Sequence, residues 1–253
     1  MMRRMQWGLM AAMLVAVVTN ATAAQAQVLR FDAQTSAAVR ARLTAARLAA
    51  DSALRRAPGP VPVVGQPDAP VTVEEFVDLQ CPACAAHQKV TEPVLADLVN
   101  KGVVRIVYWD LPLPFHQNAM DAAMVAHCTG SQGYLGARDV LLSSQQEWGE
   151  SSDMPNVLLR QVSRVVGVDT ARVRACYDKG LYLAVIRFGL EEATRRKVTA
   201  TPTIFVAGRP LVGVVAPDQL RRTVDELLTG AVVVAPNVPA WKRDLLRGQK
   251  PPR

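Results

Sequence analysis

The sequence predicts an α/β protein with a helical insertion in the middle of the chain and a helical extension before the sheet. Three observations support this. Two runs rich in β-branched residues, 71–79 and 103–111, flank a helix-forming run at 81–100. The stretch from 117 to about 197 is helical in pattern. Strand patterns return at 203–208 and 210–215 before a last helix at 217–228.

The first 26 residues have the pattern of a secretory signal peptide. Arg3 and Arg4 precede a short apolar run at 7–18, and Ala24-Gln25-Ala26 is a small-x-small site, which predicts cleavage before Gln27. The alternatives are cleavage after residues 21–23 or an uncleaved anchor, although the run is shorter than the roughly 20 residues a span needs. We therefore expect a periplasmic or otherwise exported protein, in a compartment where disulfides persist.

Charge gives a weaker indication of partners. The formal net charge of +7 falls to +5 when residues 1–26 are removed, since they hold two arginines and no acid. Much of the excess lies at 40–56 and 241–253, among alanines and without interleaved aromatics. This pattern favours a solvated face or attraction to an anionic membrane surface over nucleic-acid binding.

Residues 35–57 predict a helix with one thin apolar stripe, formed by Val39, Leu43, Ala46, Ala50 and Leu54. The stripe could pack on the body of the protein, pair with a second copy as a homo-oligomer contact (Val39 to Leu54), or stay frayed. The proline-rich run 58–70 follows and predicts a stiff, extended linker, where we place a domain boundary.

Within the sheet region, the strand at 71–79, the helix at 81–100 and the strand at 103–111 predict a right-handed βαβ unit. Pro93 has no backbone N–H and predicts a kink in the helix. The strands at 203–208 and 210–215 predict a hairpin with its turn near Gly208-Arg209.

The segment Cys81-Pro82-Ala83-Cys84 carries the clearest chemistry. A structural zinc site needs four ligands, and Cys128 and Cys176 stand alone, so we predict no metal. No helical i, i+4 pairing joins the three histidines, His87, His116 and His127. A purely structural Cys81–Cys84 bond would close a very small loop and stabilise little.

Redox chemistry fits the position of the pair better. Cys81 falls at the start of a predicted helix, where free N–H groups and the helix dipole favour an anion. Pro82 suits the first helical turn. We expect Cys81 to be the exposed attacking thiolate and Cys84, one turn inside, to be the resolving thiol.

Three motifs together carry a family resemblance: "VEEFVDLQCPAC", "DLPLPFHQNA" (110–119) and "TPTIFVAG" (201–208). In this order they resemble the DsbA-like family of the thioredoxin superfamily, exported thiol-disulfide oxidoreductases, over roughly residues 65–228. The resemblance implies a thioredoxin fold with an inserted helical domain, preceded here by the N-terminal extension.

The resemblance also implies roles for single residues. Pro202, at the head of a strand, should be a cis-proline facing Cys81, with Thr201 before it and a backbone that pairs with substrate. Glu75, six residues before Cys81, matches a buried acid that relays protons to Cys84. Glu74 should point to the opposite face and contact solvent, and we expect His87 on the outer face of its helix.

One departure concerns the dipeptide between the cysteines, which is Pro-Ala where strongly oxidising relatives have Pro-His. Alanine supplies neither a charge nor a donor to the thiolate. We therefore expect a pKa less extreme than the value of about 3.5 in DsbA, against about 7 in thioredoxin. Thr201 is the residue type found in isomerase-like relatives, so the direction of electron flow stays open.

Cys128 and Cys176 both fall in the helical block, and an even remaining pair in an oxidising compartment predicts one structural disulfide. Closing about 48 residues would stabilise the fold by roughly 4 kcal/mol in the chain-entropy model. Two buried free thiols or a second redox pair are the alternatives.

We conclude from the sequence that the protein introduces disulfides into exported proteins through its CPAC site. The resemblance implies cysteine-containing, partly unfolded substrates, a DsbB-like membrane partner and no cofactor. The alternatives are a DsbC/DsbG-like isomerase or reductase with a DsbD-like partner, and a non-redox chaperone-like binding module. The predicted domains are a signal peptide (1–26), an extension and linker (27–60), the first part of the fold (61–116), the inserted helical domain (117–180), the second part of the fold (181–230) and a basic tail (231–253).

Overall fold

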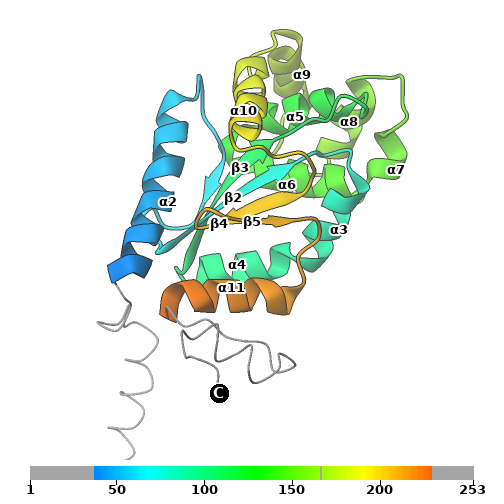
Figure 1. Ribbon diagram of the computed structural model, residues 1–253. Helices are drawn as coiled ribbons and strands as arrows, with labels where there is room; N and C mark the ends of the chain where they lie inside the picture. Colours follow the sequence, from blue (N-terminus) through cyan, green and yellow to red (C-terminus); the bar gives the residue numbers. More distant parts are fainter. Residues whose placement is uncertain (1–36, 166, 230–253) are drawn as a thin grey trace, which may run out of the picture.

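The computed structural model describes residues 37–165 and 167–229, and its centre is a five-stranded mixed sheet with helices on both faces (Figure 1). The central strand β2 (Val71–Val77) pairs in parallel with β3 (Val104–Asp110) and antiparallel with β4 (Thr203–Val206). The edges are β1 (Val63–Val64) beside β3 and β5 (Arg209–Val212) beside β4. The predicted α/β class is confirmed.

Ten helices surround the sheet in the described part of the chain. They are α2 (Ala37–Arg56), α3 (Pro82–Val90), α4 (Glu92–Asn100), α5 (Ala119–Cys128), α6 (Gly130–Ser143), α7 (Gln145–Trp148), α8 (Asn156–Val162), α9 (Thr170–Asp178), α10 (Leu183–Arg195) and α11 (Pro217–Thr229). None of them is long and apolar enough to cross a bilayer. The predicted signal peptide (1–26) and basic tail (231–253) lie outside the described residues, and the predicted domain boundaries stay predictions.

Both faces of the two central strands are covered, and every residue of β2 and β3 is buried. On one face Phe76 and Trp109 pack with Ala53 of α2 and Ala193 of α10. On the other face the strands pack against α3, α4, α6 and α11 (Figure 1). The continuous β-branched runs therefore form strands buried on two sides, as expected for a sheet between helical layers.

The N-terminal helix α2 packs on the body of its own chain. Leu43, Ala50 and Ala53 are buried, and Asp51 accepts a hydrogen bond from Arg105 Nη2 at 2.6 Å. The sequence left three possibilities for this helix: packing on the body, pairing with a second copy, or fraying. In the structure it packs on the body, so its apolar stripe is not free to pair with a second copy.

The proline-rich linker contains a strand that the sequence analysis missed. Val63 and Val64 pair antiparallel with Val107 and Ile106 as β1. Two residues between prolines are too short to show the alternation that predicts a strand.

The helix predicted over 81–100 is two helices that meet at Thr91. Pro93 lies in the first turn of α4, where its missing N–H is tolerated. The buried Thr91 hydroxyl donates to the carbonyl oxygen of Val215 at 2.7 Å. The predicted kink is therefore a complete break, tied to the chain before α11.

The predicted hairpin is confirmed, but its turn lies one residue earlier than expected. Val206 pairs with Arg209, and the two loop residues, Ala207 and Gly208, have φ values of 46° and 78°. Positive φ at both positions is the geometry of a type I′ turn. Ala207 rarely adopts it, which is why the sequence favoured Gly208-Arg209.

Candidate active site

Cys81 and Cys84 lie at the start of α3, directly after β2. Cys81 is the N-cap residue and Pro82 opens the helix. Both side chains are thiols in this structure. Cys81 is 8% exposed and Cys84 is fully buried. The order of accessibility is the predicted one, but Cys81 is less exposed than expected.

A loop from the other end of the chain covers the Cys81 sulfur. The Thr201–Pro202 peptide bond is cis, and Pro202 directly precedes β4. Cys81 Sγ lies 3.5 Å from the carbonyl oxygen of Thr201. The N–H of Gly213 donates to the carbonyl oxygen of Pro202 at 2.8 Å. The fold thus brings Thr201 and Pro202 beside Cys81, 120 residues away in sequence.

The surroundings of Cys81 favour its thiolate. A hydrogen bond from Cys84 lowers the pKa of Cys81 most; burial acts against it, and Thr201 and the N–H groups of Cys84 and Ala83 lower it further, to about 5. Burial, together with the neighbouring Cys81 sulfur, raises the pKa of Cys84 far above its usual value. One sulfur with a lowered pKa and some exposure, beside one fully buried thiol, is the asymmetry that thiol-disulfide exchange requires.

Glu75 lies on β2 with no exposure to solvent, as the resemblance implied. Its Oε1 accepts a hydrogen bond from Arg138 Nη2 of α6 at 2.5 Å and lies 3.4 Å from His87 Nε2. Burial raises the pKa of Glu75, but the Arg138 guanidinium and the His87 imidazole outweigh this effect and hold it below its usual value. Glu75 is therefore a carboxylate at neutral pH and a poor proton carrier.

His87 is not on the outer face of its helix, and that expectation was wrong. The side chain is fully buried on the same face of α3 as Cys84, three residues earlier. His87 packs beside Glu75 of β2, and α3 packs against α6. The residue pattern of α3 alone does not show which neighbours cover this face.

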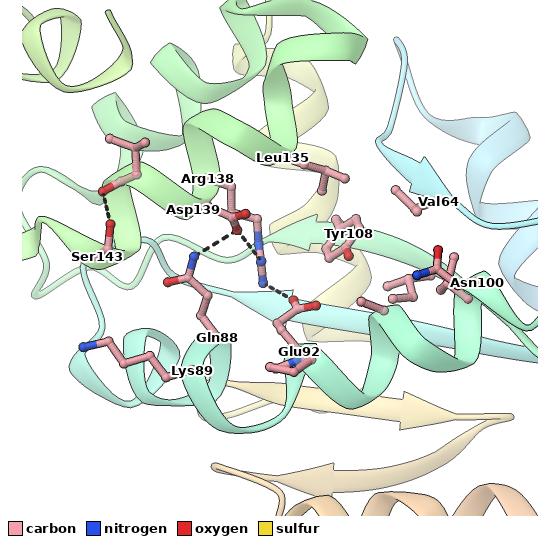
Figure 2. Close-up of a pocket in the computed structure, with 15 residues that line it drawn as sticks. Val64, Gln88, Lys89, Glu92, Asn100, Tyr108, Leu135, Arg138, Asp139 and Ser143 are labelled. Atoms are coloured by element: carbon pink, nitrogen blue, oxygen red, sulfur yellow. Dashed lines mark hydrogen bonds and ion pairs between the residues drawn. The ribbon is translucent and has the colours of Figure 1, made fainter. Parts of the chain in front are cut away.

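Glu92, in the first turn of α4, completes a group of ionisable side chains behind the cysteines. Its Oε1 lies 2.8 Å from Arg138 Nη2. Burial and the negative charge of Glu75 raise the pKa of Glu92 to about 8. Arg138 also lies over the ring of Tyr108, 4.9 Å from its centroid. Glu92 and Arg138 line a cleft of about 650 Å³ between α4 and α6 (Figure 2).

Glu75, His87 and Glu92 hold ligand-type atoms within 4.8 Å of one another. Such a spacing could hold a metal ion, but the Arg138 guanidinium contacts both carboxylates. The cationic position between the two acids is therefore already filled by a side chain.

Glu74 is buried as well, contrary to the expectation that it contacts solvent. It does point to the opposite face of the sheet from Glu75, but α10 covers that face. Its carboxylate pairs with Arg196 at the end of α10 and accepts a hydrogen bond from Trp109 Nε1 at 3.3 Å.

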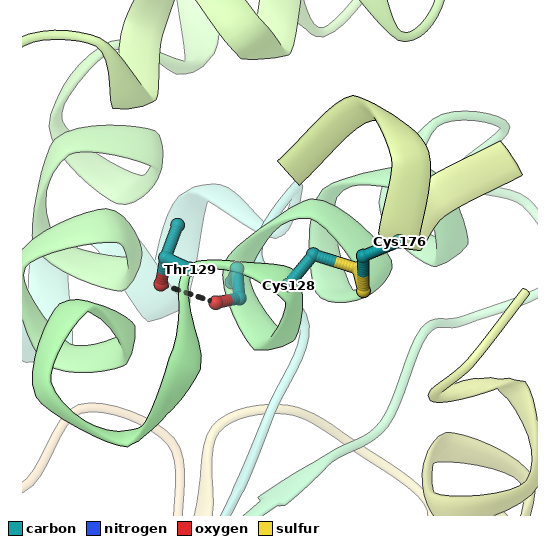
Figure 3. The surroundings of a disulfide bond; sticks show 4 residues. Cys128, Thr129 and Cys176 are labelled. Carbon is teal, nitrogen blue, oxygen red and sulfur yellow. Dashed lines mark hydrogen bonds between the residues drawn. A yellow bond between two sulfur atoms is a disulfide. The ribbon is translucent and has the colours of Figure 1, made fainter. Parts of the chain in front are cut away.

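Cys128 and Cys176 form a disulfide that joins the end of α5 to α9 (Figure 3). Their Cα atoms are 5.7 Å apart and 48 residues separate them. The bond lies in the helical insertion and contributes no atom to the surroundings of Cys81.

Sequence reasoning missed Asp78, which organises the loop before Cys81. Its buried carboxylate accepts hydrogen bonds from the backbone N–H groups of Gln80 and Leu113, each at 2.7 Å, and contacts His116 Nδ1 at 2.7 Å. An acid at the end of a strand, directly before the cysteines, was a signal that could have been used.

Comparisons with known proteins agree with this geometry. A family model described as "Thioredoxin" matches residues 58–226. The Na(+)/H(+) antiporter NhaA 3 of Salinispora tropica is 34% identical over 149 residues, which are 58% of this chain but only 22% of the antiporter. Disulfide bond formation protein D of Bacillus subtilis is 23% identical over 174 residues, 67% of this chain and 78% of that protein. The crystal structure of α-DsbA1 from Wolbachia pipientis superposes with a TM-score of 0.61 at 19% identity, over 72% of this chain and 98% of that one.

Proposed function

Because the chain belongs to the thioredoxin family and has the thioredoxin fold, we propose that it is an exported, DsbA-like thiol-disulfide oxidoreductase that introduces disulfides into other proteins. One observation carries the proposal. The Cys81 sulfur, whose pKa is lowered to about 5, lies 3.5 Å from the Thr201 carbonyl before a cis-proline, while Cys84 is shielded behind it.

The reaction starts from the Cys81–Cys84 disulfide. A substrate thiolate attacks Cys81 Sγ, the bond between the two enzyme sulfurs breaks, and a mixed disulfide forms while Cys84 leaves. A second substrate thiol displaces Cys81, so the substrate is oxidised and the enzyme becomes a dithiol. A Cys81 thiolate of low pKa is a good leaving group, which favours this oxidising direction. The sulfurs carry the electrons, so we expect no cofactor.

The substrates we propose are cysteine-containing, unfolded or partly folded exported polypeptides. An extended segment of such a chain would pair with the backbone at Thr201, next to the attacked sulfur. Reoxidation of the dithiol requires an electron acceptor, for which we propose a DsbB-like membrane partner.

The rival function is a DsbC/DsbG-like isomerase or reductase, kept reduced by a DsbD-like partner. The Pro-Ala dipeptide and Thr201 support it. An assembly through α2 does not, because Leu43 and Ala50 of that helix are buried in their own chain.

The reduction potential of the Cys81–Cys84 pair separates these functions. It is measured from glutathione equilibria in a Cys128→Ser, Cys176→Ser variant, so that only one pair reports. A value near −120 mV, about that of DsbA, supports the oxidase, and a value below about −200 mV supports the reductase or isomerase. Cys81→Ser and Cys84→Ser variants test the third possibility, because unchanged activity on reduced substrate proteins would mean a binding module without redox chemistry.

A further inference from the structure

The buried group behind the cysteines contains two carboxylates and only one guanidinium. Arg138 is 2% exposed and contacts both Glu75 and Glu92. A second negative charge in such a site is costly unless it is paired. One of the two acids therefore holds a proton near neutral pH, and the geometry identifies it as Glu92, because Glu75 has the short Arg138 hydrogen bond and faces His87.

Cys84 is connected to these acids through α3. Cys84 and His87 lie on one face of the helix and are both fully buried. Among the described residues, neither ring nitrogen of His87 has a hydrogen-bond partner, and Nε2 lies 3.4 Å from Glu75 Oε1. An imidazole can accept a proton on one ring nitrogen while the other gives one up. His87 thus lies about one helical turn from the shielded thiol, and one of its ring nitrogens lies within 4.8 Å of a Glu92 carboxylate oxygen.

Glu92 is the member of the group that reaches solvent. Its side chain is 16% exposed, whereas the Glu75 side chain is not exposed at all. The opening is the cleft between α4 and α6, which Gln88 and Asp139 also line (Figure 2). A proton on Glu92 can therefore exchange with water without passing the Cys81 surface, where substrate binds.

We propose that Glu92 is the proton acceptor and donor for Cys84, with His87 between them, and that the α4–α6 cleft is where this proton exchanges with solvent. The inference rests on the proposed function and deepens it. It moves the relay role that the family resemblance implied for Glu75 to a residue of the next helix.

The proton balance follows the direction of exchange. When the disulfide is attacked and Cys84 leaves as a thiolate, Glu92 gives up its proton and Cys84 becomes a thiol. In the reverse direction the Cys84 thiol loses its proton to the Glu92 carboxylate. Cys84 then attacks Cys81 in the mixed disulfide, the enzyme disulfide forms, and the bound thiol leaves as a thiolate.

The charged and titratable groups around Glu92 come from β2, β3, α3 and α6. They are Glu75 from β2, Tyr108 from β3, His87 and Lys89 from α3, and Arg138 and Asp139 from α6. Asp139 is the matched control, since it is an acid of the same cleft with a side chain 59% exposed. Asp139→Asn makes the same acid-to-amide change in this cleft without removing a buried proton site.

The test measures protonation directly. Infrared difference spectra, reduced minus oxidised, are recorded at pH 7 for the unsubstituted protein and for Glu92→Gln, Glu92→Asp and Asp139→Asn. The rate at which glutathione leaves its mixed disulfide with Cys81 is measured from pH 5 to 9 by acid quenching and mass spectrometry. We expect a carboxylic-acid carbonyl band that changes with redox state, is lost in Glu92→Gln and is kept in the other two variants.

We further expect release of glutathione to be about 10-fold or more slower in Glu92→Gln at pH 7, with loss of one inflection from the pH profile. Asp139→Asn should keep both the rate and the inflection. An unchanged band and profile in Glu92→Gln, beside an active Cys81–Cys84 pair, would overturn the proton path alone. An inert pair in the unsubstituted protein would overturn the proposed function and the path with it.

Discussion

Replacing Arg138 with Met should lower stability strongly and in a pH-dependent way. Arg138 is 2% exposed, contacts two buried carboxylates and lies over Tyr108. Methionine keeps much of the length but not the charge. Removing one partner of a buried ion pair typically costs about 3–5 kcal/mol. For a protein of this size, we expect the midpoint of thermal unfolding to fall by about 6–20 °C at pH 7.

The sign of the pH dependence follows from Glu75. In the unsubstituted protein the pKa of Glu75 is lowered, so the pair stabilises the fold above the ordinary value of 4.5, and this contribution is lost as pH falls below it. In Arg138→Met burial is largely unopposed and the pKa of Glu75 rises. The variant then loses stability as pH rises above about 4.5. The deficit should therefore be largest at neutral pH and shrink in acid.

The assay is urea unfolding at pH 4 and pH 7, with Glu75→Gln, Arg138→Met as the control. The double variant should recover most of the loss, because no buried charge remains without a partner at Glu75. A deficit below about 1 kcal/mol at pH 7, or one that is the same at both pH values, would refute the reasoning.

Three further outcomes are expected. In the reduced protein, the Cys81 thiolate should titrate by ultraviolet absorbance with a midpoint of about 5. Ionised Cys81 then stabilises the reduced fold at high pH, and this contribution is lost as pH falls through that value. A midpoint above 8 would contradict the site geometry. Replacing Cys128 and Cys176 by serine should lower the free energy of unfolding by about 4 kcal/mol, from the 48-residue separation, and leave the Cys81 titration unchanged. Leu43→Ala should cost about 2–5 kcal/mol in chemical unfolding without changing the size on gel filtration, whereas a change in size would show that α2 joins two copies.

The order of polar and apolar residues along the chain predicted those strands and helices that depend mainly on their own sequence. β2, β3 and the hairpin are long or alternating enough to be recognised, and the helical pattern from 117 to about 197 predicted the insertion. The two-residue strand Val63–Val64 exists only because β3 offers a free edge, and Ala207 adopts positive φ because the hairpin requires it. Both causes are contacts with other parts of the chain, so they could not be predicted from the local sequence.

The same division holds for the site. Cys81, Cys84 and Pro202 stand out by spacing, because each needs a defined place on a helix or strand. Arg138 and Glu75 are 63 residues apart in sequence. No spacing or motif around either residue predicts that they form a pair. His87 was placed on the wrong side of α3 because burial depends on what the helix packs against, not on its own pattern.

The break at Thr91 has a mechanical consequence for the surroundings of Cys81. Thr91 is bonded to Val215, and Gly213, two residues earlier, is bonded to Pro202. The helix that carries the cysteines and the loop that carries the cis-proline are thus linked by two hydrogen bonds through the segment 213–215. Moving them apart would break the buried Thr91–Val215 hydrogen bond, at a cost of about 1–3 kcal/mol. We therefore expect Cys81 and Thr201 to keep their spacing when a partner approaches the sulfur.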